Sequence, residues 1–532
     1  MLVLAGIVTS TLAQDISIPD TGLNAAIRAA LQKPTGPLTE QDLLSLTNLN
    51  ASSRNISSII GLENATNLVS LDLRQNRLTT FSLPADLTNL ITLDVSFNRI
   101  TNFSILGGPA NITTLNLADN RLSNLTLPGN LNQLTSLNIE DNGFTVFNLP
   151  SNMTSIVFLD LGFNSITNCT LPNGLTNLQT LVLAANLLTN FDLPANLTRL
   201  TSFDIHINGL TSFKLPAGLT ALTNLDLDEN ELTSFEVPAG MTNLVLLDLS
   251  FNQLTDVTFP SDLGNLIDLN LNFNQFTSVN LPAGLNALTH LRLRANQFTD
   301  FTLPANLGTL IYLDISECPL SHLTLPTNLN HLDALRLSKN NLATLVLPVG
   351  MTNLTGLNLS ENQLTNLVLP PDLFRLQSLN LGGNELASLT LPPGLTNVTG
   401  FFVTGNNFTT LTLPPDMTQI TALGFLANPL TTLVLAEPLA ASLADTIVEL
   451  RNQGTSVFTY PLTPQLISPR PTEDGFEFAI TGPPGVYTLV TSDDLTTWTE
   501  LGGATNTLGT VRFIDTTPSR PAQRFYQARS GH

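Results

Sequence analysis

The stretch LDLSFNQLTDVTFPSDLGNL, residues 247–266, decides the fold because its frame repeats along most of the chain. Two leucines stand two residues apart, Asn252 follows, and a second apolar segment ends at Pro260. The asparagine slot recurs every 22 residues, seventeen times from about residue 68 to 440, with Cys318 in one slot. A period this strict predicts a solenoid. The asparagines are Asn76, Asn98, Asn120, Asn142, Asn164, Asn186, Asn208, Asn230, Asn252, Asn274, Asn296, Asn340, Asn362, Asn384, Asn406 and Asn428.

The physical requirements of a stacked coil explain each slot. The leucines of "LDL" point to one side of an extended chain and are buried between neighbouring strands about 4.8 Å apart. The turn after the strand leaves backbone N–H and C=O groups inside the coil, where an unpaired group costs about 1–3 kcal/mol. An asparagine amide supplies both donor and acceptor, so these asparagines are predicted to form a structural ladder. Cys318 is a weak donor and acceptor and predicts a locally weaker coil.

The second apolar segment forms the return path of each coil. Phenylalanines such as Phe191, Phe213, Phe235 and Phe301 stand five residues after the asparagine slot, an apolar residue follows two positions later, and proline usually comes next. Alternation of period two that ends at proline predicts a short extended segment and argues against a long helix on this side.

The frame L-x-x-L-x-L-x-x-N-x-L-T-x-F-x-L-P-x-x-L-x-x resembles the leucine-rich repeat family. The resemblance implies an α/β solenoid dominated by β structure, an arc with a parallel sheet on its concave side. At the front, helices are predicted from Asp20 in "DTGLNAAIRAAL" and from Thr39 in "LTEQDLLSL", before a degenerate coil with Arg54 in the asparagine slot. These helices and "GLENATNL" resemble the N-terminal cap of internalin-like bacterial surface proteins.

The remaining segments complete the predicted domain organisation. Residues 1–14 end a short apolar run at Ala13 and predict a signal peptide, although no basic residue precedes the run. The alternative is a buried N-terminal strand of a cytoplasmic protein. The cap and degenerate repeat span 15–67, the repeats 68–440, a helix and strand cap 436–460, a proline-rich linker 461–471, and a small β module 472–532.

The C-terminal module resembles one found on many exported bacterial proteins, through "GVYTLVTSDDLTTWTEL" and "QRFYQAR". The resemblance implies attachment or sorting at the cell envelope. The alternative for its aromatic residues Tyr487, Trp498, Phe525 and Tyr526 is that they form the core that a small domain needs.

Composition excludes several functions. A net charge of −21 argues against binding to nucleic acid or to an anionic membrane. Five scattered histidines, no nucleophile motif and no CxxC pair predict a non-enzymatic protein without metal or cofactor. Cys169 and Cys318 should lie about 33 Å apart, too far for a disulfide. A hydrolase of envelope glycans, the alternative, would need two carboxylates about 5–9.5 Å apart in a cleft.

The residues six, four and two before each asparagine slot are predicted to face solvent on the concave side. The middle position carries Asp72, Asp94, Asp160, Asp204, Asp226 and Asp248. This stripe suits cations, basic peptides or glycans, or it reflects only the polar side chains that such a strand favours. A second row, Phe97, Phe163, Phe251 and Phe273, stands just before the slot and packs along the rim or stays partly exposed.

A basic and aromatic group interrupts the acidic stripe and is the candidate ligand site. Three arginines, a histidine and a tyrosine should converge within about 10 Å, and Arg and Tyr are frequent interface anchors. The alternative is an ion-pair cluster with Asp314 and Asp268. The predicted site residues are His290, Arg292, Arg294, Tyr312, Asp314 and Arg336.

The sequence therefore predicts a monomeric, secreted or cell-surface bacterial protein without a transmembrane segment. Its predicted function is to bind an unidentified protein or polysaccharide through the concave face. The alternative is a structural spacer or adhesion component of the cell envelope.

Overall fold

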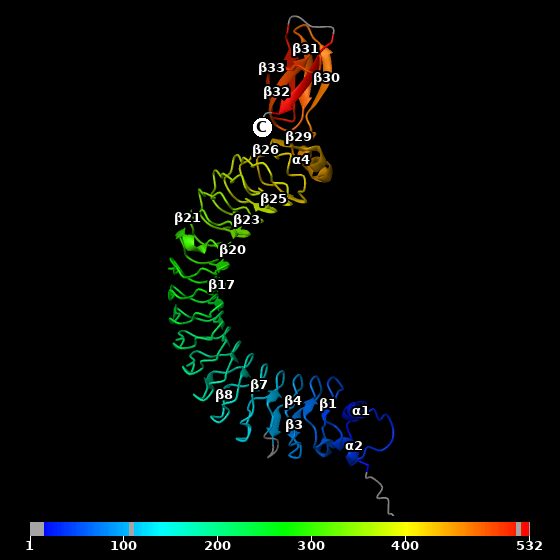
Figure 1. Ribbon diagram of the computed structural model, residues 1–532, viewed down its shortest axis with the longest axis vertical. Coiled ribbons are helices and arrows are strands. Elements are labelled where there is room, and N and C mark those ends of the chain that lie inside the picture. The colour runs from blue at the N-terminus through cyan, green and yellow to red at the C-terminus, as the bar shows by residue number, and fades with distance from the viewer. Residues whose placement is uncertain (1–14, 106–110, 518–522, 531–532) are drawn as a thin grey trace, which may run out of the picture. The chain divides into compact units, whose positions relative to one another are not determined.

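The computed structural model describes residues 15–105, 111–517 and 523–530 (Figure 1). Its internal contacts divide the chain into unit 1, Met1–Gln275 with Val279–Ala287, and unit 2, Phe276–Ser278 with Leu288–His532. The predicted signal peptide lies outside the described residues. Within those residues, every helix is too short or too polar to cross a membrane.

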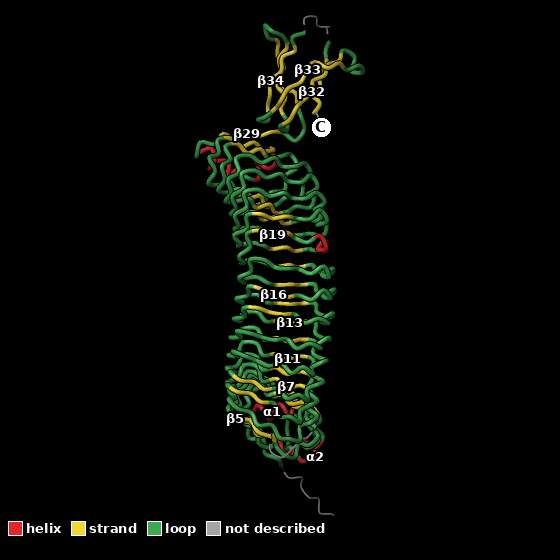
Figure 2. Tube along the Cα trace, turned by 90° about the vertical axis from the view of Figure 1, so that its left-hand side faces the viewer, coloured by secondary structure: helices red, strands yellow, loops and turns green. Residues whose placement is uncertain are grey.

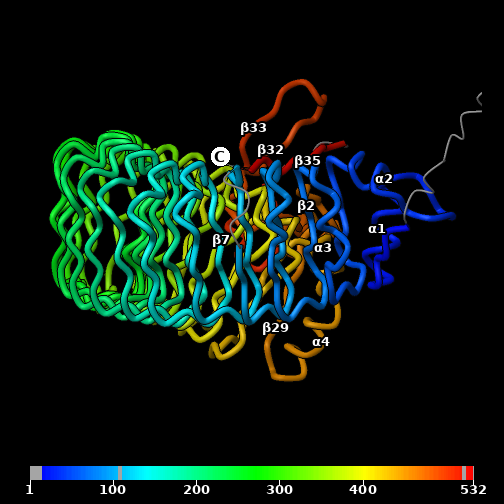
Figure 3. The backbone as a smooth tube through the Cα atoms, turned by 90° about the horizontal axis from the view of Figure 1, so that it is seen from below, coloured from blue at the N-terminus to red at the C-terminus, as the bar shows by residue number. Residues whose placement is uncertain are grey.

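Two short helices close the N-terminal end of unit 1. Helix α1, Thr21–Ala30, begins at Asp20, whose carboxylate accepts a hydrogen bond from the Leu23 amide at 3.0 Å. Helix α2, Glu40–Leu44, begins with a capping box between Thr39 and Asp42. Both agree with the sequence prediction, and a 3-10 helix, η1 (Leu62–Asn64), follows. Figure 3 shows α1 and α2 at the outer end of the first coils.

The strands that precede the asparagine slots are hereafter called the row strands. In unit 1 they are parallel and in register, and each residue pairs with the residue 22 positions later, as Leu225 pairs with Leu247. One leucine of each "LDL" motif thus lies above the next in the core. The strands, in stacking order, are β1 (Asn48–Asn50), β2 (Ser70–Asp72), β4 (Thr92–Asp94), β6 (Thr114–Asn116), β7 (Ser136–Asn138), β9 (Phe158–Asp160), β11 (Thr180–Val182), β12 (Ser202–Asp204), β13 (Asn224–Asp226), β15 (Leu246–Asp248) and β17 (Asp268–Asn270).

Unit 2, taken by itself, has the same arrangement of strands, and Figure 2 shows the short strands in successive coils. Its row strands also pair in parallel, as Leu335 pairs with Leu357. They are β18 (His290–Arg292), β20 (Tyr312–Asp314), β22 (Ala334–Arg336), β23 (Gly356–Asn358), β24 (Ser378–Asn380), β25 (Gly400–Phe402) and β27 (Ala422–Gly424).

The return path of the coil is extended, as predicted. Pairs of short parallel strands form on this side, and their inward residues Phe235 and Phe301 are buried. A 3-10 helix, η2 (Ala305–Leu307), follows one of them. These strands are β3 (Thr80–Leu83), β5 (Asn102–Ile105), β8 (Val146–Asn148), β10 (Asn168–Thr170), β14 (Ser234–Glu236) and β16 (Asp256–Thr258) in unit 1, and β19 (Asp300–Thr302), β21 (His322–Thr324), β26 (Thr410–Thr412) and β28 (Thr432–Ala436) in unit 2.

The asparagine slot joins each coil to the one before it. The Asn252 amide nitrogen donates to the carbonyl oxygens of Leu227 and Leu249 at 2.9 and 3.2 Å, and its Oδ1 accepts from the Leu232 amide at 3.0 Å. Equivalent bonds, 25, 3 and 20 residues back, occur at other asparagines of the series. Asn252 is 8% exposed, so the amide satisfies backbone groups that water does not reach.

Cys318 replaces this amide with longer contacts. Its sulfur accepts a hydrogen bond from the backbone amide of Asn296 at 3.4 Å and lies 3.5 Å from the Leu293 carbonyl oxygen. Because sulfur is a weak donor and acceptor, the backbone groups around this slot are held less strongly.

The residue just before each asparagine slot adopts the left-handed backbone conformation, which the sequence prediction missed. Its φ is 51° at Ile207 and 48° at Phe251, and in two coils the position holds Gly383 and Gly405. Bulky residues adopt this conformation only at a cost. The coil therefore imposes it, because the chain must turn there for the asparagine to reach the preceding coil.

A second asparagine series lies on the exposed turns. The Asn243 and Asn265 amides donate to the carbonyl oxygens of Thr220 and Thr242, each at 2.8 Å and 23 residues earlier. Because these bonds are exposed, water can replace them, and they contribute less than the buried series.

The last coil of unit 2 ends in two helices and a strand. The single helix expected here is interrupted at Leu443, giving α3 (Glu437–Ser442) and α4 (Ala444–Asn452). Strand β29, Ser456–Tyr460, then pairs in parallel with β28. The Tyr460 hydroxyl donates to the Leu413 carbonyl oxygen at 2.6 Å, which ties this cap to the repeats.

Two antiparallel three-stranded sheets form the C-terminal module. The core of the module is formed by Phe478, Ile480, Tyr487 and Leu489, and Tyr526 packs against it. Trp498 is not part of this cluster, and the guanidinium carbon of Arg529 lies 5.9 Å from the centroid of its ring. One sheet contains β30 (Gln465–Pro471), β31 (Phe476–Thr481) and β34 (Thr510–Asp515). The other contains β32 (Gly485–Ser492), β33 (Thr499–Asn506) and β35 (Phe525–Ser530).

The predicted linker, residues 461–471, is wrong from Gln465 onward. These residues form β30, which pairs with β31 with an irregularity between Ile467 and Arg470. Prolines are tolerated because β30 is an edge strand, where an amide facing away from the partner strand is not needed.

Candidate functional site

The solvent-facing side of the row strands, hereafter the row face, presents three rows of side chains. The first, second and third rows contain the residues six, four and two before each asparagine slot. In unit 2 the first row begins with His290 and Tyr312, and the second with Arg292, Asp314 and Arg336.

Tyr312 is the centre of the predicted ligand site. The His290 ring stacks beside it with a centroid separation of 6.0 Å. The guanidinium carbons of Arg292 and Arg336 lie 5.7 and 5.3 Å from the Tyr312 centroid. The Tyr312 hydroxyl donates to Asp314 Oδ2 at 3.1 Å, and burial together with Asp314 raises the tyrosine pKa. The structure thus brings five of the six predicted residues together around one aromatic ring.

Arg294, the sixth predicted residue, belongs to an ion-pair group that the sequence prediction did not include. Its Nη2 lies 2.9 Å from Glu317 Oε1, and Lys339 Nζ lies 3.2 Å from the same oxygen. The Arg294 hydrogen bond lowers the Glu317 pKa. Glu317 and Lys339 occupy the left-handed position before the slot, so the frame of alternating strand residues could not reveal them.

The acidic residues of the second row have a structural role. The Asp226 and Asp248 carboxylates accept hydrogen bonds from the backbone amides two residues later, at 3.0 and 2.9 Å. Asp72, Asp94, Asp160, Asp204 and Asp314 do the same, as do asparagines such as Asn358. Since either Asp or Asn can accept this bond, the geometry favours the structural interpretation of the stripe.

One part of the stripe combines ligand types that hold metal ions. Ligand atoms of Asp204, His206 and Asp226 lie within 4.8 Å of one another. His206 Nδ1 is 2.6 Å from Asp204 Oδ1, so this nitrogen is already engaged. Burial, followed by the charges of Asp248 and Asp204, raises the Asp226 pKa to about 6. The trio could accept a divalent cation through the carboxylates, although the sequence prediction contained no metal site.

The predicted phenylalanine row remains half exposed. Phe97, Phe163 and Phe251 have exposed fractions of 51%, 53% and 47%. Phe251 stacks on Phe273 with a centroid separation of 4.2 Å. Each lies at the left-handed position, so its side chain leaves the coil at the edge of the row face.

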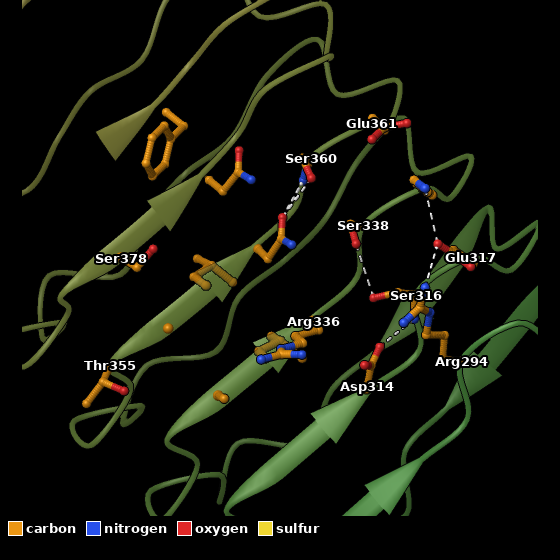
Figure 4. Close-up of a pocket in the computed structure, with 18 residues that line it drawn as sticks. Arg294, Asp314, Ser316, Glu317, Arg336, Ser338, Thr355, Ser360, Glu361 and Ser378 are labelled. Carbon is orange, nitrogen blue, oxygen red and sulfur yellow. Dashed lines mark hydrogen bonds and ion pairs between the residues drawn. The ribbon is translucent and has the colours of Figure 1, made fainter. Parts of the chain in front are cut away.

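What is hereafter called the Tyr312 cluster comprises His290, Arg292, Tyr312, Asp314 and Arg336. Asp314 and Arg336 also line a hollow of about 640 Å³ on the row face of unit 2. Arg294, Glu317 and Lys339 line one end, and Phe402 lines it four coils after Asp314. Figure 4 shows Ser316 and Ser338 joined by a hydrogen bond, with Arg336, Thr355 and Ser378 along the hollow. The sequence signal for this hollow is the run of small first-row residues Ala334, Gly356 and Ser378, which the prediction did not use.

The repeats match known families. The family described as "BspA type Leucine rich repeat region (6 copies)" matches residues 141–248, 248–343, 271–386 and 359–442, which together span 302 of the 532 residues (141 to 442). "Leucine Rich repeats (2 copies)" matches residues 66–108. No curated protein matches this chain.

Several solved structures are similar to this chain. YopM from Yersinia enterocolitica is 29% identical, with a TM-score of 0.62 over 77% of this chain and 82% of its own. The functional domain of InlJ from Listeria monocytogenes, which includes a cysteine ladder, is 21% identical, with a TM-score of 0.58 over 87% and 94%. The Arabidopsis receptor kinase HAESA, in complex with the peptide hormone IDA and the co-receptor SERK1, is 27% identical, with a TM-score of 0.51 over 71% and 68%.

The InlJ comparison concerns the fold alone. Leucine-rich repeat solenoids are typical of protein-binding and adhesion proteins and are generally non-enzymatic scaffolds. The regular 22-residue frame, the parallel row strands and the family match agree. The chain belongs to the leucine-rich repeat family, with repeats of the BspA type.

Proposed function

We propose that this protein is an exported bacterial recognition protein that binds a protein or polysaccharide through the row face of unit 2. The observation that carries the proposal is the convergence of His290, Arg292 and Arg336 on Tyr312. A half-buried tyrosine between guanidinium groups presents a rigid anchor with hydrogen-bond donors on both sides. Such a site can hold a ligand with little loss of side-chain freedom.

The local charge pattern supports recognition at this place. The chain has only 20 lysines and arginines against 41 acidic residues. Two of these basic residues, Arg292 and Arg336, lie against Tyr312. Arg294 and Lys339 are fixed by Glu317. Prearranged side chains of this kind favour selective binding more than high affinity.

Similar proteins support a bacterial source and ligand binding. The chain is similar to YopM from the bacterium Yersinia enterocolitica, and the HAESA structure contains a peptide ligand. The apolar run in residues 1–14 is consistent with a signal peptide. We also propose that the protein is a monomer and that its C-terminal module serves attachment or sorting at the cell envelope.

The test is a pull-down from bacterial envelope and extracellular fractions with the full chain. It is run beside a variant in which Arg292, Arg294, Tyr312 and Arg336 are changed to Ala. The matched control changes three exposed arginines elsewhere, Arg121, Arg199 and Arg375, to Ala.

A ligand held by the wild type and the control but lost by the Tyr312-cluster variant supports the proposal. Equal capture by all three proteins, or no capture, contradicts it. Circular dichroism and thermal melting must show that the variant is folded, because Tyr312 also contacts Asp314.

The alternative function is a spacer or adhesion component of the envelope. The specific observation in its favour is that the second-row carboxylates of unit 1, such as Asp226 and Asp248, are used to bind backbone amides. If the polar residues of the row face only stabilise the backbone of the coil, their presence does not indicate a ligand site. A negative pull-down would therefore favour the spacer.

A further inference from the structure

The hollow in unit 2 has a floor of unusually small residues. Along the first row, the rings of His290 and Tyr312 give way to Ala334, Gly356, Ser378 and Gly400 in successive strands. From β22 to β25 these small residues extend over about 14 Å at the usual strand spacing. Small or absent side chains on these neighbouring strands leave room that the coil itself does not need.

Gly356 shows that the room is open. A Cβ placed on Gly356 would meet no atom within 4 Å. Its φ lies outside the left-handed region, so an ordinary residue would fit the backbone of β23 without strain. The absence of a side chain at Gly356 therefore opens the hollow instead of allowing a turn.

The glycines at the far end make space for an aromatic ring. A Cβ on Gly400 or Gly424 would come within 3.2 or 2.9 Å of the Phe402 ring. Phe402 pairs in register with Gly424 on β27. The ring thus lies against the glycine positions of two adjacent strands, at one end of the hollow.

Polar groups line the hollow, and its charges balance. Three cationic side chains, Arg294, Arg336 and Lys339, face three carboxylates, Asp314, Glu317 and Glu361. The other polar side chains that line it are Ser316, Ser338, Thr355, Asn358, Ser360, Ser378 and Asn380. Hydroxyls and amides both donate and accept hydrogen bonds, which suits a ligand rich in hydroxyl groups.

These features disfavour other ligand classes. The net charge of −21 repels polyanions, and the equal numbers of cations and carboxylates in the hollow offer them no excess positive charge. Phe402 is the only large apolar side chain in the lining whose residue is not buried, since Leu335 and Leu357 are core residues. A polypeptide ligand is usually anchored by aromatic or arginine side chains in well-packed, desolvated pockets, whereas this hollow is lined mainly by polar groups.

We propose that the hollow between Arg336 and Phe402 binds a neutral oligosaccharide. The Phe402 ring, with its negative face, attracts the polarised C–H groups of a sugar ring. Arg336, Asn358 and Asn380 hydrogen-bond its hydroxyls, and the small floor at Gly356 admits the sugar chain. This inference rests on the proposed recognition function and names its ligand class.

The experiment measures binding of cellohexaose, xylohexaose, mannohexaose and hexa-N-acetylchitohexaose to the full chain by calorimetry. Gly356→Phe fills the hollow, and Phe402→Leu removes the aromatic face. Each should weaken binding of the recognised oligosaccharide by about tenfold or more. Binding should change little between about 50 and about 500 mM NaCl, because a neutral ligand has no charge to screen.

Ser136→Phe is the matched control, because Ser136 occupies the same first-row position on β7 of unit 1. It adds the same ring outside the hollow and should leave binding unchanged. Thermal melting of all three variants shows whether each is folded. Undiminished binding to both Gly356→Phe and Phe402→Leu, or failure of all these oligosaccharides to bind the wild type, overturns the inference.

The pull-down separates this inference from the proposed function. A ligand that depends on the Tyr312 cluster, yet is captured equally by Gly356→Phe, leaves recognition intact and removes the hollow from it. A protease-sensitive ligand that Gly356→Phe excludes would assign the hollow to a polypeptide and overturn the oligosaccharide.

Discussion

The side-chain amide of Asn252 donates to the carbonyl oxygen of Leu227, 25 residues earlier, at 2.9 Å. The two residues belong to successive coils, so this buried side-chain bond adds to the backbone bonds between them, such as that from the Leu227 amide to the Asp248 carbonyl oxygen at 2.9 Å. Because the same bond recurs along the repeats, the stability of each coil depends on the amide of the next.

Asn252→Ala should lower the free energy of unfolding by about 3 kcal/mol, because the buried carbonyl of Leu227 and amide of Leu232 lose their partner. Chemical denaturation measures the change. Asn265→Ala, which removes one exposed amide bond to Thr242, is the control and should cost less than about 1 kcal/mol. Equal losses in the two variants would contradict a special role for the buried series.

Cys318→Asn should raise the free energy of unfolding by about 1 kcal/mol, the usual net value of a good hydrogen bond. An amide at this slot can replace the sulfur contacts of 3.4 and 3.5 Å with Asn296 and Leu293. Differential scanning calorimetry should show a higher melting temperature. A lower one would mean that the surrounding coil has adapted to the thiol.

Ile207→Asn should stabilise unit 1 by up to about 1 kcal/mol, because Asn tolerates the left-handed conformation better than a β-branched residue. Ile207 has a φ of 51° and is 40% exposed, so little apolar contact is lost. Ile267→Asn is the control: Ile267 is 42% exposed but not left-handed. That change should be neutral or destabilising, and a gain at both sites would refute the strain argument.

Unit 1 should lose stability as the pH rises from about 4 to about 6. Burial, then the charges of neighbouring acids, raises the pKa of Asp160 and of Asp226 to about 6 in the folded chain. A folded pKa above the unfolded value means that the folded state binds protons more tightly, so their release on raising the pH favours unfolding.

Melting temperatures measured between about pH 4 and about pH 7 check this trend. Asp226→Asn should make the decline shallower, because one of the carboxyl groups no longer titrates. Asp256→Asn, at an exposed position of β16, controls for the loss of one negative charge. A decline unaffected by Asp226→Asn would place its origin elsewhere.

Much of the architecture follows from the sequence because each coil is local. Leu247, Asn252 and Pro260 specify a strand, a turn and a return path within 22 residues, and the repeat requires the coils to stack in register. The same locality explains why the helices after Asp20 and Thr39 could be predicted from their caps. By contrast, β30 looked like a linker, because its pairing with β31 depends on a separate module.

The candidate site could be predicted only in part from the sequence, and the rest required the tertiary structure. Strand alternation by itself places His290, Arg292, Tyr312 and Arg336 on one face. The partners Glu317 and Lys339 required the left-handed turn, and the room above Gly356 required the actual directions of side chains in neighbouring coils. Sequence alone determined the coil, because its requirements repeat. Tertiary structure decided the surface chemistry, because that depends on residues which differ from coil to coil.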